Sequence, residues 1–186
     1  YTDAFVTDDQ RYLVIFGADA TSGNKLFIKD LKDPKAPLVT ILNDYSSDTS
    51  VIDVKGDKLY LFTNLNAPNG KVVVTDVKNP TPEHWTDLIP ESENVLDITT
   101  AGGYILAKYT VAALTEVKQY DFSGKFIRDI KLPSIGVAGG FSSKDDQKDT
   151  YFWFTNTCTP TSIYKLNLES GETTQYWKPS IAFNSD

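Results

Sequence analysis

The sequence has very few of the side chains that form disulfides or bind zinc. It contains one cysteine, Cys158, and one histidine, His84. A single cysteine excludes a disulfide within the chain, and one thiol does not identify the redox compartment. Zinc sites need three or four His, Cys or carboxylate ligands, so we expect no bound metal. No glycine-rich loop precedes a helix to hold a phosphate, and we expect no cofactor.

Long apolar runs and an excess of positive charge are also missing. No stretch of about 18 apolar residues occurs, which argues against a membrane-spanning helix. The chain carries 18 Lys and Arg against 25 Asp and Glu, a net charge of −7. Nucleic-acid partners demand clustered basic residues. We therefore expect neither a membrane nor a nucleic acid as a partner.

Conventional chain ends are missing too. The sequence starts at Tyr1 without an initiator methionine or a signal peptide, and it stops at Asp186 shortly after an apparent strand. We expect the chain to be a piece of a larger polypeptide. The compartment, cytoplasmic or periplasmic, stays open.

What the sequence does contain is a recurring hairpin. Residues Leu59–Asn64 read as an apolar strand, Ala67–Gly70 as a turn, and Lys71–Asp76 as a second strand that runs back. The pattern returns at Tyr151–Asn156 and Ile163–Asn167. No helical apolar period extends over about ten or more residues, so an all-β fold is predicted.

The hairpins repeat with one period along the whole chain. Their opening strands begin 47, 45 and 47 residues apart, at Tyr12, Leu59, Tyr104 and Tyr151. Their closing strands end 46, 45 and 46 residues apart, at Asp30, Asp76, Asp121 and Asn167. A period near 45 residues with several short strands per unit is typical of β-propeller blades. We predict about four four-stranded blades, at 1–44, 45–90, 91–132 and 133–180.

Two further patterns fit such blades. Opening strands such as Leu59–Thr63 are apolar at almost every position, which predicts that both faces of the middle strands are covered. Asp30, Asp76 and Asp121 end strands just before turns, where Asx side chains bond the turning backbone. We interpret these repeated carboxylates as structural and not catalytic.

Residues for nucleophilic catalysis are not recognisable. No Gly-x-Ser-x-Gly elbow occurs, and His84 is expected in a surface loop. Cys158 is interpreted as a loop thiol on a different blade from His84. Asp145, Asp146 and Asp149 lack the spacing of a calcium loop and lie among lysines, so we interpret them as a solvated turn. We predict no catalytic residue in this chain.

A family resemblance rests on five strings in collinear order. They are Asp8–Asp9 with Arg11–Leu13; Thr21–Leu31; Thr63–Asn64 with Ala67–Asn69; Trp85 with Asp87–Glu91; and Phe154–Asn156 with Thr159–Pro160 and Ile163–Tyr164. Together they cover essentially the whole chain. The combination resembles the propeller domain of prolyl oligopeptidase (prolyl endopeptidase), a serine peptidase family.

The resemblance implies a place in a larger enzyme. It implies that the chain is the last four blades of a seven-bladed propeller that caps an α/β-hydrolase domain, which is absent here. In that family the propeller gates a buried Ser-Asp-His site, admitting short peptides and excluding folded proteins. The chain would be the non-catalytic, substrate-gating part of a proline-specific serine endopeptidase that cleaves short peptides after proline. Its partners would be the hydrolase domain and short proline-containing peptides.

The resemblance also implies which loops face the hydrolase domain. These are the loops between second and third strands: Gly17–Asn24, Asn64–Gly70, Thr110–Leu114 and Asn156–Pro160. The residues expected to bind there are Ala18, Asp19, Thr21, Asn64, Asn66, Asn156 and Thr157. Some relatives place a substrate-contacting arginine where this chain has Ala18, so that contact is not carried over.

Two alternatives stay open. One is a stand-alone β-propeller that acts as a binding scaffold. The other is the propeller of a related oligopeptidase B or acylaminoacyl peptidase, although the string Thr63–Asn69 favours the prolyl member. In each case four blades alone would leave two sheet faces uncovered, so we expect the isolated chain to self-associate or to be marginally stable.

Overall fold

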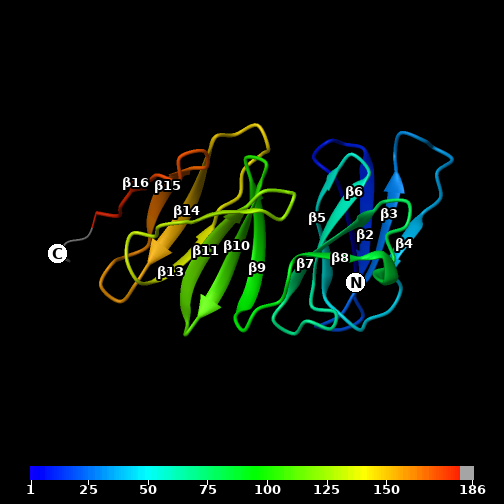
Figure 1. Cartoon of the computed structure of the whole chain (residues 1–186), viewed down its shortest axis with the longest axis horizontal. Coiled ribbons are helices and arrows are strands. Elements are labelled where there is room, and N and C mark those ends of the chain that lie inside the picture. The colour runs from blue at the N-terminus through cyan, green and yellow to red at the C-terminus, as the bar shows by residue number, and fades with distance from the viewer. Residues whose placement is uncertain (181–186) are drawn as a thin grey trace. The chain divides into compact units, whose positions relative to one another are not determined.

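The computed structural model describes residues 1–180 and folds them into sixteen strands (Figure 1). The strands form four antiparallel sheets of four strands each, which confirms the predicted all-β propeller class. The single helical segment among the described residues is a 3₁₀ turn, η1 (Pro82–His84). Within residues 1–180, no helix has the length and the apolar character that crossing a membrane requires.

Each sheet is a meander in which consecutive strands pair in chain order. The first sheet holds β1 (Thr2–Val6), β2 (Tyr12–Gly17), β3 (Lys25–Asp30) and β4 (Val39–Leu42). The second holds β5 (Thr49–Lys55), β6 (Lys58–Thr63), β7 (Lys71–Asp76) and β8 (Thr86–Ile89). The third holds β9 (Val95–Ala101), β10 (Tyr104–Val111), β11 (Leu114–Tyr120) and β12 (Phe126–Asp129). The fourth holds β13 (Val137–Gly140), β14 (Asp149–Thr155), β15 (Ser162–Asn167) and β16 (Thr173–Trp177).

The chain divides into two compact units, of which the first runs from Tyr1 to Glu93 and contains the first two sheets. Its core lies where these two sheets meet. Val14, Leu26 and Ile28 of the first sheet cluster with Leu59 and Leu61 of the second, and all five are at most 1% exposed. Burial of an aliphatic side chain of this size contributes about 1.5–3 kcal/mol, so this contact is a main source of stability for the unit.

The second unit begins at Asn94 and contains the third and fourth sheets. Its core is rich in aromatic rings: Phe141 stacks on Phe152 with centroids 4.5 Å apart, and Phe152 stacks on Tyr164 at 5.5 Å. Leu106 and Val117 of the third sheet belong to the same buried cluster. In this unit too, the hydrophobic contact is between neighbouring four-stranded sheets.

The expectation that every middle strand is covered on both faces is wrong for β2 and β14. In β6 the successive residues Leu59, Tyr60 and Leu61 are all buried, as predicted. In β14, by contrast, Phe152 is buried while Tyr151 and Trp153 are 45% and 38% exposed. β2 alternates between buried and half-buried positions in the same way. The physical reason is that one face of each of these strands has no sheet packed on it among the described residues.

The repeated carboxylates at the strand ends have the structural role predicted for them. Asp30, Asp76 and Asp121 each accept a hydrogen bond from the backbone N–H two residues further on, at 2.8–2.9 Å. These are Asx turns, in which the side chain fixes the backbone that leaves the strand. Asn167 closes the corresponding turn of the fourth sheet by accepting from the N–H of Glu169.

Candidate functional site

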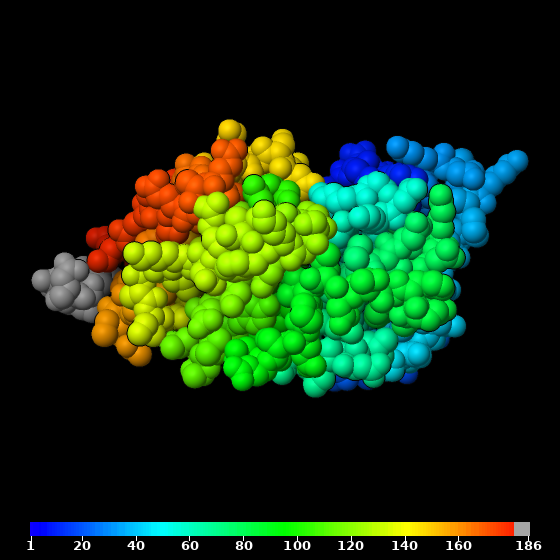
Figure 2. Space-filling model, in the orientation of Figure 1, coloured from blue at the N-terminus to red at the C-terminus, as the bar shows by residue number. Residues whose placement is uncertain are grey.

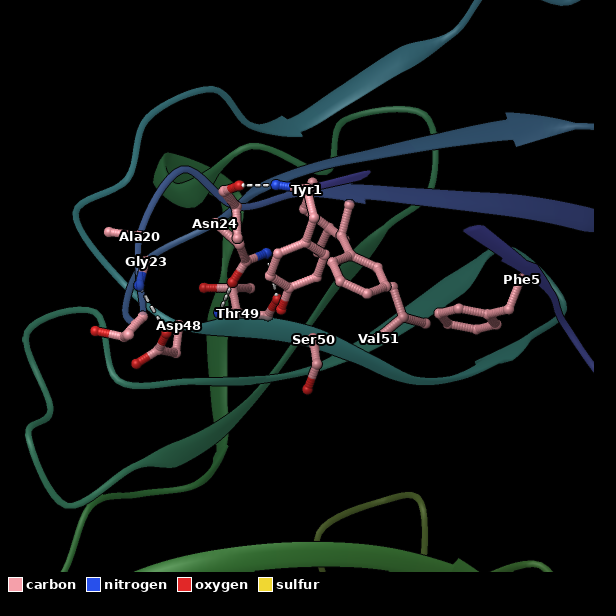
Figure 3. Close-up of a pocket in the computed structure, with 13 residues that line it drawn as sticks. Tyr1, Phe5, Ala20, Gly23, Asn24, Asp48, Thr49, Ser50 and Val51 are labelled. Carbon is pink, nitrogen blue, oxygen red and sulfur yellow. Dashed lines mark hydrogen bonds between the residues drawn. The ribbon is translucent and has the colours of Figure 1, made fainter. Parts of the chain in front are cut away.

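The first unit contains a pocket of about 220 Å³ beside the loop that joins β2 to β3 (Figure 3). Its lining comes from β1, from the end of β2, from this loop, from the start of β3, and from the start of β5 with the residue before it. Figure 3 shows Phe5 and Val51 towards one end and Ala20, Gly23 and Asp48 at the other. The pocket therefore has an apolar end and a polar end.

The apolar end is built from aromatic and aliphatic side chains of the first two sheets. Tyr1 packs edge-on against Phe16, with ring centroids 6.1 Å apart. Leu26 and Val51 complete this part of the lining. Such a surface binds an apolar ring or side chain by excluding water from it.

The polar end is fixed by hydrogen bonds between the β2–β3 loop and the segment that leads into β5. The Asn24 carboxamide accepts from the N–H of Thr49 and donates to the carbonyl of Thr49, both at 2.9 Å. The backbone N–H of Gly23 donates to the Asp48 carboxylate at 2.7 Å. Because three consecutive contacts join the two segments, the polar wall is held in place before any ligand arrives.

Gly23 is required by the backbone of this wall. Its φ is +79°, and a Cβ built at this position would lie 2.0 Å from the carbonyl oxygen of Tyr45. Any other residue would have both the left-handed backbone cost and a direct clash. The close approach of Gly23 to Tyr45 brings the loop against the segment that leads into the second sheet.

Asp48 also connects the pocket to the β6–β7 loop. Its carboxylate accepts from the Asn64 side-chain nitrogen at 3.1 Å, and its backbone N–H donates to the Asn64 side-chain oxygen at 2.7 Å. The carboxamide of Asn64 is thus used within the chain. By binding Asp48, it stabilises the polar wall of the pocket.

The predicted binding residues are distributed over three loops. Ala18 and Thr21 line the pocket, while Asp19 is exposed on the same loop. Asn66 is exposed in the β6–β7 turn with φ of 52°. The binding role of these side chains stays a prediction.

In the second unit, the Asn156 side-chain nitrogen donates to Ser134 Oγ and to the carbonyl of Ile135 at 3.0 and 3.2 Å. Its side-chain oxygen accepts from the N–H groups of Cys158 and Thr159. Thr157 is exposed at the tip of this loop. Asn156 therefore shapes its own loop, and its binding role, like that of Thr157, stays a prediction.

The binding residues predicted from the sequence did not include Asn24, Asp48, Phe16 or Val51, which also line the pocket. Asn24 ends the loop Gly17–Asn24 that was expected to face a partner, so the loop was identified but its anchor was not. The available signal was an Asn immediately before a hairpin-closing strand. Phe16 and Val51 look like ordinary core positions in the sequence.

A wider groove of about 600 Å³ lies in the second unit, beside the turn between β10 and β11. It is lined by Val111 and Leu114 at the turn, by Lys118 and Ile130 along the strands, and by Ile135. Ile135 is 76% exposed. The groove and the pocket of the first unit are both next to a loop between the second and third strands of a sheet.

The first sheet carries a charged cluster at the opposite end of β2 from the pocket. The Arg11 guanidinium donates twice to Asp30, at 3.1 and 3.2 Å, and lies 3.6 Å from Asp57. The pKa of Asp30 is lowered from 3.8, chiefly because its carboxylate accepts a hydrogen bond from the Lys32 backbone N–H. The hydrogen bond from the Arg11 side chain lowers this pKa further. The cluster contacts both sheets of the unit and belongs to its framework.

His84 and Cys158, the two residues considered for catalysis, are both exposed to solvent. His84 Nδ1 lies 3.2 Å from Thr81 Oγ1, and its side chain is 52% exposed. Cys158 is exposed in the second unit, which contains no histidine. Over residues 1–180, no three His, Cys, Asp or Glu side chains are placed to hold a metal ion. Cys158 thus has no histidine in its own unit to act as its base, and the polar neighbours of His84 are Thr81 and Glu83 of its own turn.

Comparisons with known proteins give a consistent result. Residues 1–179 match the family model described as "Prolyl oligopeptidase, N-terminal beta-propeller domain". The chain is 47% identical over 186 residues to the prolyl endopeptidase of Elizabethkingia meningoseptica. This alignment covers 100% of the chain and 26% of the relative. It is 29% identical over 179 residues to the dual function macrocyclase-peptidase POPB of Amanita bisporigera, in an alignment that covers 92% of the chain and 24% of that relative.

Solved structures agree on the fold. A structure from "Structural and Mechanistic Analysis of Two Prolyl Endopeptidases: Role of Inter-Domain Dynamics in Catalysis and Specificity" matches with a TM-score of 0.92 at 24% identity, over 100% of this chain and 27% of that one. The apo structure of prolyl oligopeptidase B from Galerina marginata matches with a TM-score of 0.86 at 22% identity, over 100% and 28%. The chain thus spans about a quarter of the length of these relatives.

Proposed function

The chain belongs to the prolyl oligopeptidase family as part of its N-terminal β-propeller domain. From this premise we propose that the chain is the non-catalytic, substrate-gating part of a proline-specific serine endopeptidase that cleaves short peptides after proline. The single observation that carries the proposal is the match of residues 1–179 to the propeller domain alone. The relative that is 47% identical is a prolyl endopeptidase, which favours this reading over an oligopeptidase B or acylaminoacyl peptidase.

The pocket gives the gating role a physical basis. β1 is the first strand of its sheet, and it has one edge without a strand partner among the described residues. An extended peptide can follow such an edge and place an apolar ring in a neighbouring pocket. Proline suits this mode because its ring is apolar and its fixed φ lowers the entropy lost on binding. Phe16, Leu26 and Val51 provide the apolar surface.

The loops between second and third strands are proposed to meet the hydrolase domain of the same polypeptide. The pocket and the groove of the second unit are both next to such loops. A peptide held at this end of a sheet would be close to the partner domain, where the serine chemistry takes place. Steric exclusion by the surrounding blades then limits the substrates to short, unfolded peptides.

A bulky substitution at Ala18 tests the pocket in the intact parent protein. Ala18→Trp fills the pocket, and we expect KM for a proline-containing peptide to rise several-fold at unchanged kcat, because only binding common to ground and transition states is lost. Ala36→Trp is the matched control, since Ala36 is half-buried in the β3–β4 loop and does not line the pocket. Equal kinetics for the two variants would remove the pocket from the proposal.

When isolated, the chain is further proposed to self-associate through its uncovered sheet faces. Tyr151 and Trp153 of β14 are large and exposed, and so are Tyr176 and Trp177 of β16, at 66% and 53%. Figure 2 shows β16 (red and orange) on the visible surface. Apolar surface of this kind favours association with another surface over contact with water.

A further inference from the structure

The pocket beside the β2–β3 loop carries a negative charge on one wall. Asp48 lies at its polar end with Ala20 and Gly23, while Phe5 and Val51 lie towards the other end (Figure 3). Asp48 is exposed, so a ligand in the pocket can reach its carboxylate. The pocket thus presents an anion at one end and an apolar surface at the other.

The carboxylate of Asp48 is held by neutral groups. Its Oδ1 accepts from the N–H of Gly23 at 2.7 Å, and its Oδ2 accepts from the Asn64 side-chain nitrogen at 3.1 Å. A carboxylate has about four acceptor sites on its two oxygens, so each oxygen can accept a further hydrogen bond. Among the described residues, no Lys or Arg forms an ion pair with it.

Two positive groups close to the pocket are directed elsewhere. Lys25 follows the lining residue Asn24, and its ammonium lies 5.2 Å from the centre of the Tyr45 ring. The α-amino group of Tyr1 donates to the carbonyl of Ala18 at 2.6 Å. Neither group pairs with Asp48, so its charge is available to a ligand.

Other carboxylates of the same unit are neutralised within the chain. Three that lie on strands form ion pairs at 3.1, 2.7 and 2.8 Å: Asp30 with Arg11, Asp53 with Lys55, and Asp87 with Lys71. Asp48 differs from these three because it lines a pocket and has no cation as a partner. The difference indicates a site for a positively charged group.

We propose that Asp48 is a specificity-determining residue that favours peptides with a positive charge beside their proline. The proline ring would occupy the apolar end of the pocket, and an ammonium or guanidinium group of the same peptide would pair with Asp48. The proposal rests on the proposed function, because it takes the pocket as a peptide site. It adds the charge of the preferred substrate.

The geometry of the wall makes this pairing effective despite its exposure. An ion pair in contact with water is weak, because water and salt screen it. Here the bonds from Gly23 and Asn64 already fix the carboxylate, so little side-chain freedom is lost on binding. A ring anchored at the apolar end also raises the local concentration of the charge near Asp48.

Matched peptides test the charge in the intact parent protein. One N-acetylated peptide carries lysine directly before its only proline, and its partner carries norleucine there, which removes the charge and keeps the alkyl chain. We expect kcat/KM to be about two- to fivefold higher for the lysine peptide. The preference should decrease with added salt, and Asp48→Asn should bring the ratio of the two values close to one.

A second pair of peptides distinguishes the two sources of an ammonium group. The norleucine peptide is compared with a free and with an acetylated N-terminus. A preference for the free terminus that Asp48→Asn abolishes assigns the site to a terminal ammonium, and a preference for lysine alone assigns it to a side chain. Either result supports the proposal.

Two control variants separate the charge of Asp48 from the shape of the wall. Asn64→Ala removes a hydrogen bond from Asp48 and keeps its charge, so it should change kcat/KM equally for both peptides of a pair. Asp44→Asn removes an exposed carboxylate from the same β4–β5 connection, outside the pocket lining, and should leave the ratio unchanged.

Three results would overturn the proposal. They are equal kcat/KM within both pairs of peptides for the wild type, a preference that Asp48→Asn leaves intact, and a preference that Asp44→Asn reduces as much as Asp48→Asn does. These outcomes are distinct from a failure of the proposed function. Ala18→Trp tests the pocket without reference to charge, so an effect of Ala18→Trp without a charge preference removes only the role of Asp48.

Discussion

The carboxamide of Asn24 pairs with the backbone of Thr49 through two hydrogen bonds of 2.9 Å. The two residues are 25 positions apart in the chain and belong to different sheets. Their contact holds the β2–β3 loop against β5 and makes the polar wall of the pocket. The first predictions concern this contact.

Asn24→Ala should destabilise the chain by about 1–3 kcal/mol, because it removes both side-chain hydrogen bonds and leaves partly buried backbone groups of Thr49 unpaired. Urea unfolding followed by fluorescence measures the change. Asn43→Ala is the control, since Asn43 is exposed, and we expect a change within about 0.5 kcal/mol. Equal effects of the two substitutions would show that the carboxamide of Asn24 contributes nothing specific.

Gly23→Ala should be more destabilising than Gly56→Ala. Both glycines have positive φ, +79° and +64°, which costs a non-glycine residue about 1–3 kcal/mol. A Cβ at Gly56 meets nothing within 4 Å, whereas one at Gly23 lies 2.0 Å from the Tyr45 carbonyl oxygen. The difference between the two free energies of unfolding therefore isolates the clash. A Gly23→Ala variant as stable as Gly56→Ala would contradict the close approach of the loop to Tyr45.

Stability should fall in acid because the pKa of Asp30 is lowered in the folded chain from its ordinary 3.8. A lowered pKa means that folding favours the carboxylate, so this contribution is complete above pH 3.8 and is lost as the pH falls through the folded-state value. The pKa of Asp121, which accepts from Ser123, is lowered too, so several groups act in one direction. Asp30→Asn should reduce stability at pH 7 and flatten the acid dependence.

The check is the free energy of unfolding measured between pH 7 and pH 2.5 for the wild type and Asp30→Asn. Asp19→Asn is the matched control, because the Asp19 carboxylate makes no hydrogen bond within residues 1–180. An acid dependence that Asp30→Asn leaves unchanged would mean that the Arg11–Asp30 pair is not coupled to folding.

The isolated chain should associate in a concentration-dependent way, and Tyr151→Ser/Trp153→Ser should weaken the association. These side chains form the exposed face of β14, and their removal takes away the apolar surface that drives the contact. Light scattering across a concentration series measures it. Leu38→Ser, at a residue that is 49% exposed in a loop, should have no effect. A wild-type chain that stays monomeric at high concentration would oppose the prediction.

The repeated strands could be predicted from the sequence because their signal is local. The hairpin predicted from Tyr12 and closed at Asp30 is found as β2 and β3, with Tyr12 opposite Asp30. The turn residue Asp121 also behaves as predicted, because an Asx turn involves only neighbouring backbone. The last strand of the second sheet, β8, starts at Thr86, directly after Trp85 closes the 3₁₀ turn.

Features that depend on contacts between neighbouring sheets could not be predicted from the sequence. Trp153 and Phe152 are both aromatic, and nothing in the sequence tells which face of β14 is covered. Asn24 reads as an ordinary turn residue until its partner Thr49, in another sheet, is known. The binding role predicted for loop residues such as Asn66 depends on the hydrolase domain proposed as the partner, and the described residues do not include such a domain.

The most direct test of the account is the release of p-nitroaniline from a short proline-linked peptide by the intact parent protein and by this 186-residue chain. The account predicts cleavage after proline by the parent and none by the chain, because the chain supplies the gate and not the serine chemistry. Turnover by the chain that is abolished by His84→Ala, or a parent protein inactive on the peptide, would contradict it.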